Sequence, residues 1–231
     1  MIYEFPEFVD VGDTGLLVRF SDEMDRESNL RVHDLARRLE ADLHPGIIEL
    51  IPAYNSLLIN YDPLRVSRGT CMKLALDYTA IYASDGSKKS RVVEIPVCYG
   101  EHFGPDIEFV ANHNGIGVED VISIHSSVNY TVFMLGFTPG FAYLGGLNEK
   151  ISVPRLEAPR DRVEPGSIGI ANSQTGIYPI ASAGGWRLIG RTPLRLFKPA
   201  EKHPFLYQAG DTIVFRPISL SQYENMAQTN D

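Results

Sequence analysis

Arginines set among glycines and prolines are the side chains of this sequence best suited to binding chemistry. Arg155, Arg160 and Arg191 lie between residues 135 and 197, a stretch that holds 10 of the 20 glycines and 6 of the 15 prolines. Glycine and proline at this density predict tight turns and close backbone approaches. A guanidinium group can bind a carboxylate or phosphate through two parallel N–H···O bonds. The stretch therefore predicts a pocket for a small anionic ligand, although such arginines can instead brace loops by donating to backbone carbonyls.

The charge of this stretch differs from that of the rest of the chain. It contains seven Lys or Arg against four Asp or Glu, so its net charge is +3, whereas the whole chain carries −8. An electropositive, turn-rich surface on an acidic protein favours a small anion as ligand. The absence of Lys/Arg blocks and a pI near 5.3 argue against binding to nucleic acid or to an anionic membrane.

Neutral polar side chains accompany the arginines. Gln174 and Tyr178 lie at a predicted strand–turn–strand corner, and Thr192 is held extended by the proline that follows it. Pockets need few but well-placed polar groups. We therefore expect Arg155, Gln174, Tyr178 and Thr192 to bind substrate.

His125 occupies the apolar side of a predicted helix. Val118, Val121, Ile122 and His125 follow one another at i, i+3, i+4 and i+7, which is one helical face. Periodicity alone indicates a core histidine whose ring nitrogens are satisfied. The alternative is a proton carrier at the edge of a cavity, because an imidazole titrates near neutral pH.

Several familiar catalytic signatures are absent from the sequence. It contains no GxxxxGK[ST], GxGxxG, HExxH or GxSxG pattern, and its six histidines show no metal-ligand spacing. We therefore expect no metal site, and any use of ATP without the familiar phosphate loops. Cys71 and Cys98 show no CxxC spacing, so reduced structural thiols are expected.

Composition and length are those of a globular protein. The chain has 231 residues, of which 44% are hydrophobic and 22% charged, which suits one large or two small domains. No apolar run approaches the roughly 20 residues of a membrane span, and the first residues lack a signal-peptide pattern. We therefore expect a cytoplasmic protein.

The first 88 residues predict an α+β domain. Apolar spacing and turn signals give strands at 16–20, 47–51 and 56–61, and helices at 27–43 and 69–83. This order is most of a ferredoxin-like unit. A polar segment at 84–90 predicts a linker, and the strand at 91–99 either closes the first sheet or opens a second domain; we favour the second.

Residues 89–231 predict a mainly-β domain. Two short helices, 107–114 and 118–126, resemble a helix-turn-helix, but the second lacks the Arg, Lys, Asn or Gln that a recognition helix needs. After Tyr130, many short strands separated by turns predict a closed or nearly closed barrel. The predicted strands are TVFML, SIGIA, GIYPI, WRLIG, LRLF and TIVFRPI. The tail from Ser219 is expected to be a frayed helix or disordered.

Long motifs in the arginine-bearing stretch resemble one family. The segments LGFTPGFAYLGGL, PGSIGIA, QTGIYPI and GGWRLIGRTPLRLF are similar to the allophanate hydrolase subunit 1 family, which includes the 5-oxoprolinase B subunits and the Kip-type inhibitor of a sporulation histidine kinase. Weaker similarity extends over nearly the whole chain. The resemblance implies a small ferredoxin-like N-terminal domain and a cyclophilin-like β-barrel C-terminal domain.

The resemblance, rather than the pattern of residues, also implies a function in a complex, as a subunit of an ATP-dependent 5-oxoprolinase. The expected partners are a homologous barrel protein of the allophanate hydrolase subunit 2 type and a third, TIM-like subunit, with ATP and its Mg²⁺ counter-ion used by the complex. The expected substrate is a small anionic amide, 5-oxo-L-proline, which is opened to L-glutamate. On this basis His125, Arg160 and Arg191 are the predicted catalytic residues, and no residue is assigned to a cofactor.

Two other functions stay open from the sequence. The chain could be a regulatory protein that inhibits a sensor histidine kinase by gripping its helices. It could also be the substrate-binding part of a urea or amide carboxylase.

Overall fold

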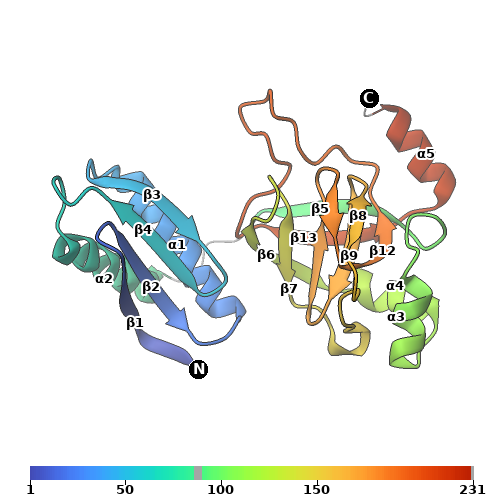
Figure 1. Cartoon of the computed structure of the whole chain (residues 1–231), viewed down its shortest axis with the longest axis horizontal. Coiled ribbons are helices and arrows are strands. Elements are labelled where there is room, and N and C mark those ends of the chain that lie inside the picture. Colours follow the sequence, from blue (N-terminus) through green and yellow to red (C-terminus); the bar gives the residue numbers. More distant parts are fainter. Residues whose placement is uncertain (86–89, 230–231) are drawn as a thin grey trace. The chain divides into compact units, whose positions relative to one another are not determined.

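The computed structural model describes residues 1–85 and 90–229 (Figure 1). The chain divides into two compact units, Met1–Lys89 and Ser90–Asp231. Residues 86–89 of the predicted linker, and with them the predicted domain boundary at 88/89, lie outside the described residues. Each unit has its own hydrophobic core.

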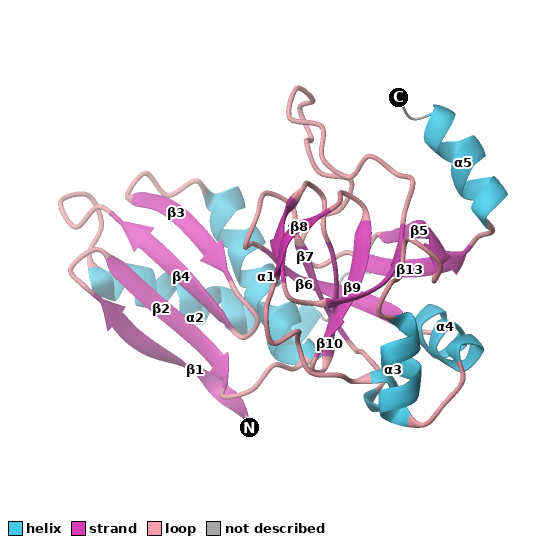
Figure 2. Cartoon of the chain, turned by 45° about the vertical axis from the view of Figure 1, so that its right-hand side comes forward, coloured by secondary structure: helices cyan, strands magenta, loops and turns pink. Residues whose placement is uncertain are grey.

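The N-terminal unit is a four-stranded antiparallel sheet with two helices on one face (Figure 2). The strands lie in the order β1-β2-β4-β3. Leu16, Val18, Leu57 and Ile59 point from the two central strands into the core, where they meet Leu39 of the first helix. The strands are β1 (Ile2–Val11), β2 (Gly15–Ser21), β3 (Ile47–Pro52) and β4 (Ser56–Tyr61), and the helices are α1 (Arg26–Asp42) and α2 (Arg68–Asp85).

The sequence analysis missed β1. This strand pairs with β2 through Val9↔Leu17 and its neighbours. Most of its residues are exposed, and it contains Pro6, so it lacks the buried alternation that marks a half-buried strand. The four elements that follow β2 were predicted correctly to within two residues at each end.

Local chemistry fixes the ends of α1. The Asp25 carboxylate accepts a hydrogen bond from the Ser28 backbone N–H at 2.8 Å, which caps the start. Leu43 ends the helix in the left-handed conformation, with φ of 49°. The chain then turns at Gly46, where an added Cβ would lie 2.6 Å from the Val66 side chain. Only glycine allows this close approach.

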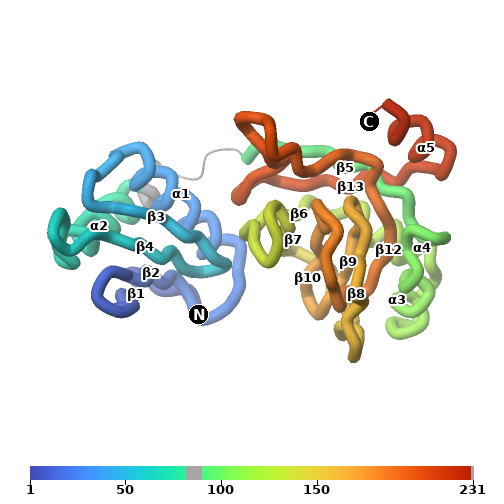
Figure 3. Tube along the Cα trace, turned by 45° about the horizontal axis from the view of Figure 1, so that its top comes forward, coloured from blue at the N-terminus to red at the C-terminus, as the bar shows by residue number. Residues whose placement is uncertain are grey.

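The C-terminal unit is built on a closed barrel of seven strands, in the order β10-β7-β6-β13-β5-β12-β9 (Figure 3). The pair β13 and β5 is parallel, which brings the last strand beside the first strand of the unit. The barrel strands are β5 (Val92–Tyr99), β6 (Asn129–Leu135), β7 (Ala142–Gly145), β9 (Ser167–Ala171), β10 (Gln174–Ile177), β12 (Arg187–Arg191) and β13 (Thr212–Pro217). The predicted barrel is therefore confirmed, as is the placement of residues 91–99 outside the first sheet.

Shorter elements surround the barrel. Strands β8 (Arg160–Val163) and β11 (Ser182–Gly184) form a separate two-stranded sheet. The helices are α3 (Ile107–Asn114), α4 (Val118–Ser126) and α5 (Leu220–Thr229), with the 3₁₀ turn η1 at Glu149–Ile151. Helix α5 covers most of the predicted tail; Asn230 and Asp231 lie outside the described residues.

The strand predicted at LRLF, residues 194–197, is wrong. Leu196 is buried and packs in the core, which explains the alternating pattern. However, Phe197 makes only an isolated bridge with Phe205, and Leu196 accepts one backbone bond from Leu206. The segment belongs to a long connection between β12 and β13 rather than to the barrel wall.

Candidate functional site

An aromatic hollow of about 290 Å³ lies beside the barrel, where several connections between short strands meet. Its walls come from the approach to β7, the segment before β8, the end of β10 and the turn from β11 to β12. This volume is at the lower end of the range for small-molecule pockets. The lining residues are Phe137, Phe141, Tyr143, Arg155, Leu156, Pro159, Tyr178, Ala183, Gly184, Gly185 and Trp186.

Phe141 is the centre of the aromatic wall. It is buried and makes edge-on contacts with Tyr143, Tyr178 and Trp186 at ring-centroid distances of 4.7, 4.8 and 5.4 Å. Such edge-to-face packing fixes the rings relative to one another. Phe137 is exposed and packs edge-on against Phe141 at 5.7 Å. The expectation that phenylalanines around Pro139 line an opening, and that Trp186 forms a wall, is confirmed.

Tyr178 contributes a buried hydroxyl to this wall. Burial, the largest cause, raises the pKa of Tyr178 to about 12, although a backbone hydrogen bond at Trp186 and the charge of Arg155 oppose the rise. The phenol is therefore protonated at neutral pH and is a hydrogen-bond donor. Gly184 leaves room for it, since an added Cβ would lie 2.5 Å from the Tyr178 oxygen.

Arg155 supplies a positive charge at the hollow. Its side chain is exposed, and its guanidinium carbon lies 5.8 Å from the centroid of the Trp186 ring. No ion pair of Arg155 occurs within residues 1–85 and 90–229. Its charge lowers the pKa of Tyr143, against the larger, raising effect of burial on that phenol. Arg155 is thus a cation that remains available to a ligand.

Arg160 is held by the barrel unit itself. Its Nη2 donates to both oxygens of Asp106 at 2.9 and 2.8 Å, and its Nη1 lies 3.4 Å from the Trp186 carbonyl oxygen. Asp106 also accepts from the Leu188 backbone N–H at 2.7 Å, and Arg187 lies 3.9 Å from the same carboxylate. Asp106 therefore ties the segment before α3 to β8 and β12. Arg160 borders the hollow through the Trp186 backbone rather than lining it.

Arg191 and Thr192 lie at the end of β12, and neither lines the hollow. The Arg191 guanidinium carbon is 5.4 Å from the Phe103 ring centroid. Its Nε is buried without a hydrogen-bond partner among the described residues. The buried Thr192 hydroxyl accepts from the Leu194 backbone N–H at 3.3 Å, which shapes the turn after the strand.

His125 lies inside the barrel unit and is fully buried. Its Nδ1 is 2.7 Å from the Tyr99 hydroxyl and its Nε2 is 2.9 Å from the Thr175 hydroxyl. Because the Thr175 hydroxyl donates to the Gly169 carbonyl at 3.0 Å, it must accept from Nε2–H, and Nδ1 then accepts from Tyr99. Burial lowers the pKa of His125 to about 3, so the ring is neutral.

The geometry of His125 corrects the expectation of a proton carrier at the edge of a cavity. Both ring nitrogens are engaged by the chain, and the ring stacks on Phe215 at 4.6 Å. This is the core histidine that the helical periodicity indicated. Gln174, half-buried at the start of β10, pairs with Ala171 across the turn and does not line the hollow.

The structure therefore brings together two of the predicted site residues, Arg155 and Tyr178, within one hollow. The expectation that several arginines converge there does not hold for Arg160 and Arg191. Sequence reasoning missed Asp106, because its pairing with Arg160 spans 54 residues and no local pattern marks it.

Other chemical features of the described chain are limited. Residues 1–85 and 90–229 contain no cluster of three or more His, Cys, Asp or Glu side chains arranged to hold a metal ion. Cys71 and Cys98 are free and buried. None of the helices in that same part of the chain has the length and apolar character needed to cross a membrane.

Comparisons with known proteins agree over nearly the whole chain. The family model described as "Carboxyltransferase domain, subdomain C and D" matches residues 6–207. The chain is 43% identical to the 5-oxoprolinase B subunit of Bacillus subtilis over 223 residues, covering 92% of this chain and 93% of the relative. It is 40% identical to the 5-oxoprolinase B subunit of Escherichia coli O157:H7, covering 90% and 94% of the two chains.

Solved structures show the same similarity. The conserved uncharacterized protein PH0987 from Pyrococcus horikoshii is 47% identical, with 94% of this chain and all of that chain covered and a TM-score of 0.57. The crystal structure of TTHA0988 gives a TM-score of 0.78 at 37% identity over 89% of this chain. The matched region is only 40% of the TTHA0988 chain, so that protein carries a long additional segment.

Proposed function

The chain belongs to the family of the carboxyltransferase domain, subdomain C and D, together with the 5-oxoprolinase B subunits, and we propose that it is itself a subunit of an ATP-dependent 5-oxoprolinase. In this function the complex opens the lactam ring of 5-oxo-L-proline to give L-glutamate. The observation that carries the proposal is the 43% identity to a 5-oxoprolinase B subunit, which covers more than nine-tenths of both chains. The urea amidolyase of Saccharomyces cerevisiae is 24% identical and is matched over only 14% of its length.

We propose that the aromatic hollow, defined by the eleven lining residues above, binds the lactam substrate. Arg155 binds the substrate carboxylate through two N–H···O bonds, which its exposed and unpaired guanidinium allows. Tyr178, protonated because burial raises its pKa, donates a hydrogen bond to the amide oxygen. The rings of Phe141 and Trp186 pack against the hydrocarbon part of the substrate and exclude water.

Lactam opening needs activation of a stable amide. Phosphorylation of the amide oxygen would convert it into an activated imidate that water can attack, with the phosphate as leaving group. In this scheme a positively charged group near the amide oxygen stabilises developing negative charge. The role of the present chain is to bind and orient the lactam for that step.

The hollow does not fit ATP. Among its lining residues Arg155 is the one cation, whereas a triphosphate and its Mg²⁺ need several cationic or carboxylate ligands. The sequence also lacks the phosphate loops that cradle nucleotides. We therefore assign ATP and Mg²⁺ to the assembled complex and derive no step of this chain through them.

Arg160 takes a positioning role in this proposal. Its bonds to Asp106 and to the Trp186 carbonyl hold the β11–β12 turn that forms one wall of the hollow. Arg191, Thr192 and Gln174 lie outside the hollow, and we assign them no contact with the substrate. His125 supports the barrel from within.

The assembly and fold are part of the same proposal. The B-subunit relatives support partners of two kinds, a homologous barrel protein of the allophanate hydrolase subunit 2 type and a TIM-like third subunit, and we expect no turnover by this chain alone. The N-terminal sheet with its two helices supports a ferredoxin-like fold in which β1 takes the place of the last strand. The seven-stranded barrel supports a cyclophilin-like fold. We expect the complex to act in the cytoplasm.

Reconstitution tests the proposed function. The chain is mixed with its two partner subunits, and glutamate formation is followed with 5-oxo-L-proline and ATP present. We expect glutamate only when all three proteins and ATP are supplied. A complete mixture that consumes no 5-oxo-L-proline, yet does so when an established 5-oxoprolinase subunit of the same type replaces this chain, would contradict the proposal.

A further inference from the structure

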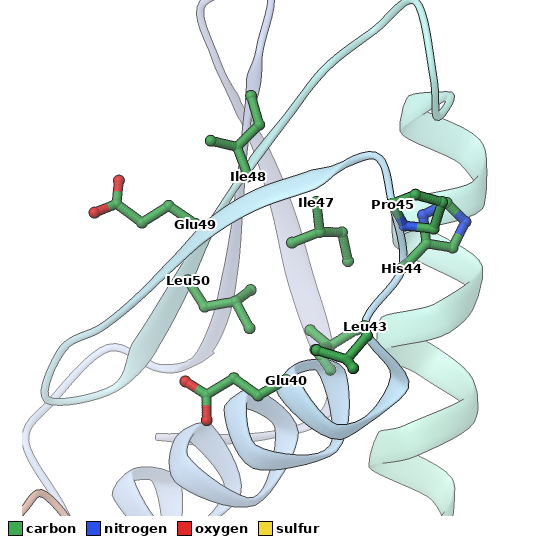
Figure 4. A pocket seen from close by; sticks show the side chains of 9 residues that line it. Glu40, Leu43, His44, Pro45, Ile47, Ile48, Glu49 and Leu50 are labelled. Carbon is green, nitrogen blue, oxygen red and sulfur yellow. The ribbon is translucent and has the colours of Figure 1, made fainter. Parts of the chain in front are cut away.

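A second hollow, of about 550 Å³, lies within the N-terminal unit between the end of α1 and the edge strand β3. Figure 4 shows Ile47 and Leu50 pointing from β3 toward the end of the helix, where they form an apolar floor. Strand β3 is the outermost strand on this side of the sheet. We call this feature the α1–β3 hollow.

Two large aliphatic side chains at the rim of the α1–β3 hollow are exposed to solvent. Leu43 is 82% exposed and Ile48 is 71% exposed. Neighbouring apolar side chains that are both exposed at one concave site commonly mark an interaction surface.

The backbone at both rim residues is irregular. Leu43 has a φ of 49°, a conformation for which helices usually use glycine after their last turn. Ile48 lies where the pairing of β3 with β4 shifts register, between Ile47 and Glu49. A branched apolar residue is thus retained at a position where glycine would relieve strain, which points to a use for its side chain.

The rim of the α1–β3 hollow is acidic. The carboxylates of Glu40 and Glu49 lie on the same side of it (Figure 4). Glu49 accepts a hydrogen bond from Asn60 at 3.1 Å, and Glu40 has no ion-pair partner within the part of the chain that the structure describes. Carboxylates beside an apolar floor are complementary to a segment that carries an aliphatic side chain next to Lys or Arg.

We propose that the α1–β3 hollow is a docking site for a partner-protein segment in which an aliphatic residue is flanked by basic residues. The aliphatic side chain packs between Leu43 and the floor, and the basic residues meet Glu40 and Glu49. The partner is the homologous barrel subunit, an identification that rests on the proposed function. The extra length of TTHA0988 supports it, because there a chain of this family is covalently joined to further polypeptide.

The test measures the dissociation constant between the full chain and the recombinant homologous barrel subunit. Leu43→Gly removes the docking side chain but suits the left-handed backbone, so the thermal midpoint should stay the same or rise while affinity falls. We expect about a tenfold or greater loss of affinity, the value of burying one leucine side chain. A merely structural role of Leu43 would not separate binding from stability in this way.

Two further variants serve as control and as test of charge. Leu64→Ala removes an aliphatic side chain that is 95% exposed in the same unit but does not line the α1–β3 hollow, and it should bind as the wild type does. Glu40→Lys should weaken binding several-fold and reduce its dependence on salt concentration.

Each outcome decides the inference separately from the proposed function. Wild-type affinity for Leu43→Gly and Glu40→Lys would overturn the docking site, and so would an equal loss with Leu64→Ala. Failure of the wild-type chain to bind the barrel subunit would also overturn it. Glutamate formation by the complete mixture of subunits decides the proposed function independently.

Discussion

The aromatic hollow and the interior of the barrel use similar side chains in opposite ways. Each contains tyrosines and a basic side chain among aromatic rings. In the interior, Tyr99 and Thr175 satisfy both ring nitrogens of His125, which is fully buried. In the hollow, Arg155 is exposed, and the pKa of the nearby Tyr178 phenol is raised to about 12 by burial.

The comparison shows that hydrogen-bond satisfaction, rather than residue type, separates structural from ligand-binding groups. His125 has the more reactive side chain, but its donors and acceptors are used within the fold. Arg155 is chemically inert as an acid or base, but its guanidinium is available for an anion. Arg160 stands between these cases, since its donors are largely occupied by Asp106.

The largest effect is expected for His125→Ala. The change opens a cavity and leaves the Tyr99 and Thr175 hydroxyls without their buried partner, which should lower the free energy of unfolding by about 3 kcal/mol or more. Urea unfolding followed by the fluorescence of Trp186, the single tryptophan of the chain, measures it. Full stability with abolished turnover would instead place His125 in the chemistry and break the comparison.

Acid should destabilise the barrel through the same histidine. The unfolded chain binds a proton on His125 below its ordinary pKa of 6.5, whereas the folded chain does so only near the lowered pKa of about 3. This contribution to stability is therefore complete above pH 6.5 and decreases as the pH falls, by about 2 kcal/mol at pH 5. His125→Gln should remove that part of the pH dependence; an unchanged slope between pH 6.5 and 5 would argue against a neutral buried ring.

A smaller effect is expected for Tyr178→Phe. Loss of one hydrogen bond to the lactam should weaken 5-oxo-L-proline binding by about 1 kcal/mol, while the aromatic wall remains intact. The Michaelis constant of the reconstituted complex measures this change, and Tyr207→Phe, which removes a buried phenol that donates to the Gly140 carbonyl, is a control for stability alone. Equal Michaelis constants for wild type and Tyr178→Phe would remove this hydroxyl from the site.

Local patterns in the sequence predicted much of the fold but only part of the site. Helical periodicity placed His125 on the buried face of α4, and turn-separated strands indicated the barrel. Strand β1 was missed because it shows little buried alternation, and residues 194–197 were mistaken for a strand because Leu196 is buried without a regular strand partner.

The missing part of the site depends on contacts between distant residues. The composition identified the arginines, but their separation into an available Arg155 and a paired Arg160 depends on Asp106, 54 residues before Arg160. The space that Gly184 leaves for Tyr178 likewise depends on the fold. Neither is encoded in a local motif, so charge and spacing alone predicted a larger cluster of arginines than the hollow contains.

The most direct test of the account compares two lactams that differ in the group Arg155 is proposed to bind. Affinities of the reconstituted complex for 5-oxo-L-proline and for 2-pyrrolidinone, which lacks the carboxylate, are measured for wild type, Arg155→Ala and the exposed control Arg162→Ala. We predict that Arg155→Ala weakens 5-oxo-L-proline binding by roughly tenfold or more, leaves 2-pyrrolidinone binding unchanged, and that Arg162→Ala alters neither. Equal affinity of wild type and Arg155→Ala for 5-oxo-L-proline would contradict the central claim.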